Sequence, residues 1–288
     1  MKQLYFFIEL TRLKKPIGFM LLFWPCAWGL TLAYDFSNDL NNYFFHLALF
    51  FLGSVLMRSA GCIVNDISDK EFDKKVKRTK NRPIASNKIS VKLGIFYTFI
   101  LCLLAFLVLI NFNNLTIILA LGSMPLAFTY PLMKRFTYWP QLFLGITFNY
   151  GLVLGWTSIV GEISLAPIIL YLGAIFWTLG YDTVYGFQDI KDDEIIGVKS
   201  TSIKFKNNPK KFLLICYSIL TGSILITGLL MSFNLLFFIS LVIPILHLSL
   251  FQIQKFNSQN KESCLRVFKS NNFFGALILI NILIGKIN

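Results

Sequence analysis

The acidic side chains of this 288-residue chain are few and unevenly placed. Nine of its 14 acidic residues fall in two short segments, residues 66–73 and 182–194. The first segment reads NDISDKEFD and carries four oxygen-bearing side chains at helical spacing: Asn65, Asp66, Asp69 and Asp73. Because spacings of three and four place side chains on one face of a helix, these residues can converge if one helix continues through them.

The second segment, YDTVYGFQDIKDD, repeats the pattern. Asp182, Tyr185, Asp189 and Asp193 follow one another at spacings of three, four and four. One helix face would therefore again carry the oxygen donors.

Two acidic faces opposite each other would repel unless cations lay between them. The donors are hard oxygens without nearby His or Cys, which suits Mg²⁺, and Mg²⁺ favours one or two carboxylates together with substrate phosphates. We therefore expect a magnesium and diphosphate site with these metal ligands: Asp66, Asp69, Asp73, Asp189 and Asp193. The alternative is a pair of solvated, charged helix ends balanced by neighbouring lysines.

Arginines are concentrated beside these carboxylates. Arg78 and Arg82 follow the first acidic segment, and Lys134 with Arg135 follows a later apolar run. Guanidinium groups hold phosphate or carboxylate oxygens through paired hydrogen bonds. We predict that these four residues, together with Asn65, bind substrate; the alternative is that they only orient the chain in a membrane.

Arg58 is a separate case, seven residues before Asn65 and thus about two helical turns deeper on the same face. Its charge would be buried among apolar residues and would need an anionic partner. A substrate carboxylate and a structural ion pair with an aspartate are both consistent with the sequence.

The elements that carry these residues are predicted to be membrane helices. The chain is 56% hydrophobic and only 14% charged, whereas a soluble domain carries roughly 25% charged residues. Nine apolar stretches approach or exceed the roughly 20 residues that cross a bilayer: 16–34, 43–64, 91–110, 115–132, 139–159, 165–188, 212–231, 235–253 and 270–287. We predict an all-α, polytopic transmembrane bundle of about nine helices that forms one domain over residues 1–288.

The basic residues predict the orientation, because Lys and Arg collect in the cytoplasmic loops of membrane proteins. With a cytoplasmic N-terminus, the segment from Lys70 to Lys88 holds eight basic residues and the external loop 35–42 holds none. Only Lys286 falls outside this rule. The net charge of +13 therefore reflects orientation in a lipid bilayer, and we expect no nucleic-acid partner.

Targeting signals and cysteine motifs add little. The first apolar run is as long as a full span and no small-residue cleavage site follows it, so no signal peptide is expected. Nor is there an Arg-rich and Ser-rich transit segment, and we expect the bacterial cytoplasmic (inner) membrane. The five cysteines lack metal-ligand spacing and are predicted to be small apolar residues of helices.

The acidic segments resemble a known family, the UbiA-type membrane aromatic prenyltransferases. GCIVNDISDKEFDKKVKRTKNRPI is similar to the first Asp-rich motif of that family and GYDTVYGFQDIKDDEIIGVKST to the second. RLKKPIGFMLLFWPCAWGL and YPLMKRFTYWPQLFLG are similar to its 4-hydroxybenzoate branch. The resemblance covers residues 12–205 and implies nine helices around a central polar cavity, open to the cytoplasm, with a lateral opening to lipid.

The resemblance implies Mg²⁺-dependent transfer of a polyprenyl group from polyprenyl diphosphate to the carbon ortho to the hydroxyl of 4-hydroxybenzoate, in ubiquinone biosynthesis. Asp182 is the candidate base for the phenolic proton, with Tyr185 close by on the same face. The same chemistry on another aromatic acceptor, of the menaquinone, haem or chlorophyll branch, is an alternative.

A transporter is the alternative from another class, because charges within a membrane also mark ion pathways. A transport path would place polar groups near the middle of the bilayer. Here the carboxylates gather at one membrane face, at the cytoplasmic ends of the predicted spans. This placement favours the enzyme.

Overall fold

A computed structural model describes residues 2–287, and every regular element in that range is a helix. The long apolar helices are α2 (Ile17–Ala33), α3 (Leu40–Ser68), α5 (Val91–Leu109), α6 (Asn114–Thr129), α9 (Leu165–Gly186), α12 (Pro209–Leu230) and α15 (Lys261–Gly285). One span is built from two shorter helices, α7 (Pro140–Asn149) and α8 (Gly151–Val160). A further span is built from α13 (Leu235–Ser240), α14 (Val242–His247) and a π-helical turn, η2 (Leu248–Gln254). The short elements are α1 (Lys2–Thr11), α4 (Lys70–Asp73), η1 (Tyr130–Arg135), α10 (Ile190–Ile196) and α11 (Thr201–Lys204).

Eight helical segments within the described residues are long and apolar enough to cross a membrane, and α2 is a ninth apolar helix of 17 residues. The prediction of about nine spans is confirmed. The two largest differences from the expected boundaries are that α3 continues to Ser68 and that α15 begins at Lys261 instead of residue 270. Both helices extend past their apolar runs because the polar residues there still bury one face.

Polar caps define the tight turns at the end away from the acidic segments. The side chains of Asp39, Asn113 and Asn234 accept hydrogen bonds from the backbone N–H groups of Asn41, Thr116 and Phe237. Such caps satisfy donors that the first helical turn leaves free.

Glycines bring α2 against α8 at the centre of the bundle. A Cβ at Gly155 would lie 2.3 Å from the carbonyl oxygen of Cys26, and one at Gly29 would lie 1.9 Å from that of Leu152. Small residues allow this close approach, which is a common way for membrane helices to associate without a hydrophobic driving force.

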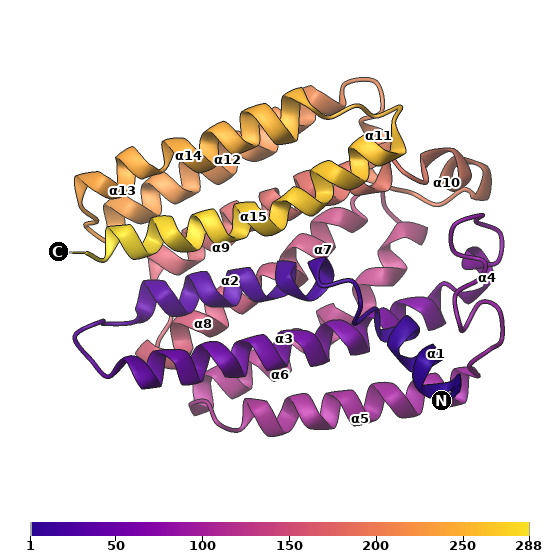
Figure 1. Ribbon diagram of the computed structural model, residues 1–288, viewed down its shortest axis with the longest axis horizontal. Coiled ribbons are helices and arrows are strands. Elements are labelled where there is room, and N and C mark those ends of the chain that lie inside the picture. The colour runs from indigo at the N-terminus through magenta and orange to yellow at the C-terminus, as the bar shows by residue number, and fades with distance from the viewer. Residues whose placement is uncertain (1, 288) are drawn as a thin grey trace.

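The charged connections lie together at one end of the bundle. Figure 1 shows α4 and α10 at the same end as the N-terminus, while the C-terminus lies at the opposite end. The two acidic segments, separated by more than a hundred residues, thereby become neighbours.

Candidate active site

A polar cavity of about 230 Å³ lies at this charged end. Both acidic segments line it, through Asn65, Asp69, Asp73, Asp182, Asp189 and Asp193. Three of the predicted basic residues line it as well, namely Arg78, Arg82 and Lys134. The structure therefore brings together most of the residues that the spacing singled out.

The first acidic face forms because helical hydrogen bonding continues past the end of α3. The N–H of Asp69 donates to the carbonyl of Asn65 at 2.9 Å, and that of Asp73 donates to the carbonyl of Asp69 at 2.8 Å. These bonds hold the three side chains at successive turns of one face, as predicted.

Asp66 departs from the prediction that it shares this face. It is absent from the residues that line the cavity, and its Oδ1 accepts from Arg12 Nη2 at 2.5 Å and from Arg82 Nη1 at 3.1 Å. One residue step turns a helix by roughly 100°, so Asp66 points toward the N-terminal arm instead of toward Asp69.

Arg12 is a site residue that the sequence patterns did not single out, because it lies outside both acidic segments. It follows α1 with a φ of 57°, a left-handed conformation that is uncommon for a residue other than glycine. Burial opposes the charged form of Arg12, but nearby acidic groups, first Cys62 and then Asp66, raise the pKa of its guanidinium. Only the assembled bundle reveals the contact between Arg12 and Asp66, since 54 residues separate the partners.

Arg82 connects the N-terminal arm to the cavity. Its Nη1 bonds to Asp66 and also to Asp73 Oδ2 at 2.8 Å. Burial raises the pKa of Asp73 and outweighs the opposing attraction of Arg82.

The second acidic face continues through a turn into α10. The N–H of Asp189 donates to the carbonyl of Gly186 at 3.2 Å, and that of Asp193 donates to the carbonyl of Asp189 at 2.9 Å. Burial, reinforced by the charge of Asp189, raises the pKa of Asp193 to about 6.

Arg78 links the loop after α4 to this second face. Its Nε donates to both carboxylate oxygens of Asp189, and its Nη1 donates to the hydroxyl of Tyr185 at 3.2 Å. Tyr185 is not one of the lining residues, so it meets the cavity only through Arg78.

The side chains of Lys134 and Arg135 point in different directions although the residues are adjacent in the chain. The Lys134 ammonium forms an ion pair with Asp69 Oδ2 inside the cavity. Arg135 is exposed, donates to the carbonyl of Ser68 at 2.6 Å, and does not line the cavity. Its predicted contact with substrate is therefore not supported by its position, because successive residues of a tight helix point to different sides.

The donor set agrees with a bound Mg²⁺ only if a phosphate supplies further ligands. Within the described residues, three or more acidic, His or Cys side chains nowhere converge tightly enough to hold a metal by themselves. Asp69 Oδ1, however, is buried without a hydrogen-bond partner. A free carboxylate oxygen among hard donors fits Mg²⁺ held by one or two carboxylates and a diphosphate.

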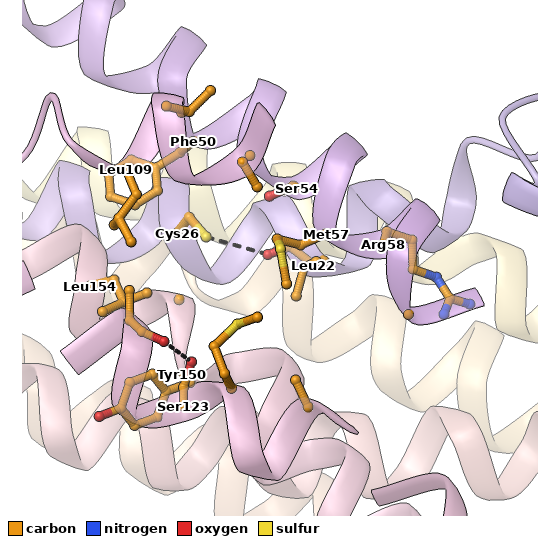
Figure 2. A pocket seen from close by; sticks show the side chains of 18 of the residues that line it. Leu22, Cys26, Phe50, Ser54, Met57, Arg58, Leu109, Ser123, Tyr150 and Leu154 are labelled. Atoms are coloured by element: carbon orange, nitrogen blue, oxygen red, sulfur yellow. Dashed lines mark hydrogen bonds between the residues drawn. The ribbon is translucent and has the colours of Figure 1, made fainter. Parts of the chain in front are cut away.

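Arg58 lies in a second, apolar cavity of about 220 Å³. Figure 2 shows its guanidinium at one end of the lining residues, with Phe50 and Leu109 at the other. The side chain of Tyr130 lines both cavities and so marks their boundary.

No acidic side chain among the described residues forms an ion pair with Arg58. Its Nε is buried without a hydrogen-bond partner, and its guanidinium lies over the ring of Phe148, 5.3 Å from the centroid. Of the two readings of this residue, the structural ion pair is thus absent from the described chain.

Comparison with known families agrees with this geometry. The model of the UbiA prenyltransferase family matches residues 22–278. The chain belongs to this family. The match includes the last three spans, which the sequence motifs had left outside the resemblance.

Curated relatives of this UbiA-family chain are similar over nearly its whole length. The mitochondrial 4-hydroxybenzoate polyprenyltransferase of Arabidopsis thaliana is 41% identical over 281 residues, covering 97% of this chain and 68% of the relative. The human protein of the same name is 39% identical and covers 98% of this chain and 75% of the relative.

Solved UbiA homologues share the fold of this family member. The apo structure of a homologue from Aeropyrum pernix has a TM-score of 0.75 at 23% identity, covering 92% of this chain and 97% of that one. A homologue from Archaeoglobus fulgidus, solved bound to GPP and Mg²⁺, has a TM-score of 0.69 at 16% identity, covering 96% and 98%.

Proposed function

We propose that this chain transfers a polyprenyl group from polyprenyl diphosphate to the carbon ortho to the hydroxyl of 4-hydroxybenzoate and releases diphosphate. The observation that carries the proposal is the pair of adjoining cavities, one lined by carboxylates and cations and the other apolar, with a buried arginine Nε that has no hydrogen-bond partner. The names of the relatives and their similarity over almost the entire chain support the same substrates.

The polar cavity binds the diphosphate in this proposal. Arg78, Arg82 and Lys134 offer donors to phosphate oxygens, while Asp69, Asp73, Asp189 and Asp193 would hold Mg²⁺. The Archaeoglobus homologue was solved bound to Mg²⁺, which supports the presence of this metal. Bound Mg²⁺ supplies positive charge that stabilises the leaving diphosphate. Asp66 is not one of the metal ligands in this proposal; it is the ion-pair partner of Arg12 and Arg82.

The acceptor binds between the two cavities. Arg58 takes its carboxylate, because the buried Nε of Arg58 has no hydrogen-bond partner and a bound anion would satisfy it. Asp182 lines the neighbouring polar cavity and accepts the phenolic proton. Loss of that proton increases electron density at the ortho carbon.

The reaction exchanges a carbon–oxygen bond for a carbon–carbon bond. The bond between the allylic carbon and the diphosphate breaks, and its electron pair leaves with the diphosphate. The ortho carbon supplies the electrons of the new bond and then loses its proton to the released diphosphate, which restores the aromatic ring. Preorganised charge around the leaving group is the main contribution of the protein.

The apolar cavity receives the first part of the prenyl tail and excludes water from the allylic cation. Figure 2 shows Met57, Ser54 and Phe50 of α3 along this cavity. A cavity of about 220 Å³ is too small for a long polyprenyl chain, so the remainder must extend into the bilayer.

For the membrane we propose the cytoplasmic (inner) membrane of a bacterium, with the N-terminus and the acidic segments on the cytoplasmic side. The strong bias of Lys and Arg toward this end supports the orientation. The relatives named above are mitochondrial proteins.

The test uses membranes containing the full chain, labelled 4-hydroxybenzoate, Mg²⁺ and prenyl diphosphates of several lengths. We expect a labelled lipid product that requires both substrates and disappears with a chelator. Product formation from another aromatic acid, but not from 4-hydroxybenzoate, would assign the chain to a different branch of the family.

A further inference from the structure

Two aromatic faces pack against each other along α9 and α15. We call this contact the α9–α15 seam; its residues are Trp177, Tyr181 and Tyr185 of α9 and Phe268, Asn271 and Phe274 of α15. The residues of α9 are four apart and those of α15 are three apart, so each set follows one helix face. The seam runs along the side of α9 that carries Tyr185 and ends beside the polar cavity.

The part of the seam farther from the polar cavity fixes the relative positions of the two helices. Trp177 Nε1 donates to Asn271 Oδ1 at 2.7 Å, and both residues are fully buried. The ring centroids of Phe274 and Trp177 are 5.5 Å apart. A buried hydrogen bond between bulky, packed side chains prevents the helices from sliding.

The part of the seam nearest the polar cavity consists of a single ring contact, between Phe268 and Tyr185. Phe268 lies 4.4 Å from Tyr185 between ring centroids, closer than its 5.8 Å distance from Tyr181. The Tyr185 hydroxyl accepts from Arg78, whose Nε and Nη2 hold Asp189. A continuous series of contacts therefore runs from the last helix to the second acidic face.

We propose that Phe268 is a positioning residue for the diphosphate end of the reaction, acting through Tyr185 on Arg78 and Asp189. The proposal rests on the proposed function. Phe268 lies outside the polar cavity, so it has no direct contact with a ligand there. Without its ring, Tyr185 could leave its rotamer, and Arg78 would lose one of the two acceptors that direct its guanidinium.

The first experiment compares Phe268→Ala with a matched variant on the same helix, Phe273→Ala. Phe273 is 60% exposed and does not belong to the seam. Because a single aromatic pair contributes modestly, we expect Phe268→Ala to raise the KM for prenyl diphosphate by about 2- to 10-fold. The KM for the acceptor should not change in Phe268→Ala. Phe268→Tyr keeps an aromatic ring and should have a KM for prenyl diphosphate close to that of the wild type. Phe273→Ala should have the same KM values as the wild type.

The second experiment asks whether Phe268 acts through Tyr185. In a Tyr185→Ala background, Phe268→Ala should have no further effect on the KM, because the intermediate contact is already gone. Hydrogen exchange supplies a readout independent of turnover: Phe268→Ala should accelerate exchange over residues 182–190 and leave 165–176 unchanged.

Additive effects of the two substitutions, an equal rise in both KM values, or unchanged exchange over residues 182–190 would overturn the proposal. Failure of the proposed function is a distinct result, since the wild-type chain would then form no product while the exchange experiment could still be read.

Discussion

Arg78 donates from Nε to both carboxylate oxygens of Asp189, at 2.8 and 3.0 Å, although 111 residues separate the two in the chain. The pair joins the loop after α4 to the turn after α9 and thus connects the two acidic segments. Because the carboxylates are held by arginine and lysine, the site can remain assembled without a ligand.

The acidic residues lead to a first prediction. Asp69→Asn or Asp189→Asn should lower kcat on the order of 100-fold, since each removes a charge from the proposed magnesium and diphosphate site. Turnover and thermal unfolding should be measured together, with Asp192→Asn as the control because Asp192 does not line the cavity. Full turnover of well-folded protein in a chelator would contradict the role of the metal.

Arg58 gives a second prediction. Truncating a buried hydrogen-bonded charge pair costs on the order of 2–5 kcal/mol, so Arg58→Ala should raise the KM for 4-hydroxybenzoate by roughly 30-fold or more. Lys should substitute poorly because it lacks the planar paired donors. A Cβ at Gly18 would lie 2.7 Å from Arg58 Nε, so Gly18→Ala should raise the same constant by displacing the guanidinium.

Saturation curves for both substrates separate the possible roles of Arg58. If only the KM for the prenyl diphosphate rises, Arg58 belongs to the phosphate site and Lys134 becomes the candidate for the carboxylate. An acceptor analogue without the carboxylate should be used equally well by the wild type and by Arg58→Ala.

Arg12 gives a prediction about stability. Arg12→Ala leaves the almost fully buried carboxylate of Asp66 with Arg82 as its remaining cation. Loss of one partner of a buried pair costs about 3–5 kcal/mol, and the 25% exposure of the Arg12 side chain reduces this to about 1–3 kcal/mol. The thermal unfolding midpoint should fall clearly for Arg12→Ala and hardly at all for Lys14→Ala; equal midpoints would mean that the contact is unimportant.

The pKa of Asp193 predicts a pH dependence. Burial raises this pKa to about 6, whereas an unfolded chain titrates near about 3.9. The folded state therefore binds the proton more tightly, and this contribution to stability is present at low pH and lost as pH rises through about 6. Asp193→Asn cannot titrate, so the wild-type midpoint minus that of the variant should decrease between pH 4 and 7. A constant difference would show that Asp193 has an ordinary pKa in the folded protein.

The charge distribution predicts the topology. Single cysteines placed within 66–88 and 191–210 should react with impermeant reagents from one side of the membrane, and those within 35–42 from the other. Loop charge is the physical reason. Labelling of 191–210 and 35–42 from the same side would contradict the arrangement of the whole bundle.

The membrane bundle and the acidic faces could be predicted from the sequence because both depend on local patterns. A run of apolar residues long enough to cross a bilayer forms a helix wherever it lies, since the backbone must satisfy its own hydrogen bonds in lipid. Spacings of three and four place Asp69 and Asp73, or Asp189 and Asp193, on one face of any helix that contains them.

Relationships between distant segments were decided only by the tertiary structure. The ion pair of Arg12 with Asp66, the rotation of Asp66 away from the polar cavity and the unpartnered Nε of Arg58 each depend on how α1, α2 and α3 pack. The contact between Phe268 and Tyr185 depends likewise on the register of α15 against α9. Hydropathy and periodicity specify which face of a helix is buried, but they do not specify the helix against which it packs; that choice depends on side-chain shape and on polar pairing across the assembled bundle.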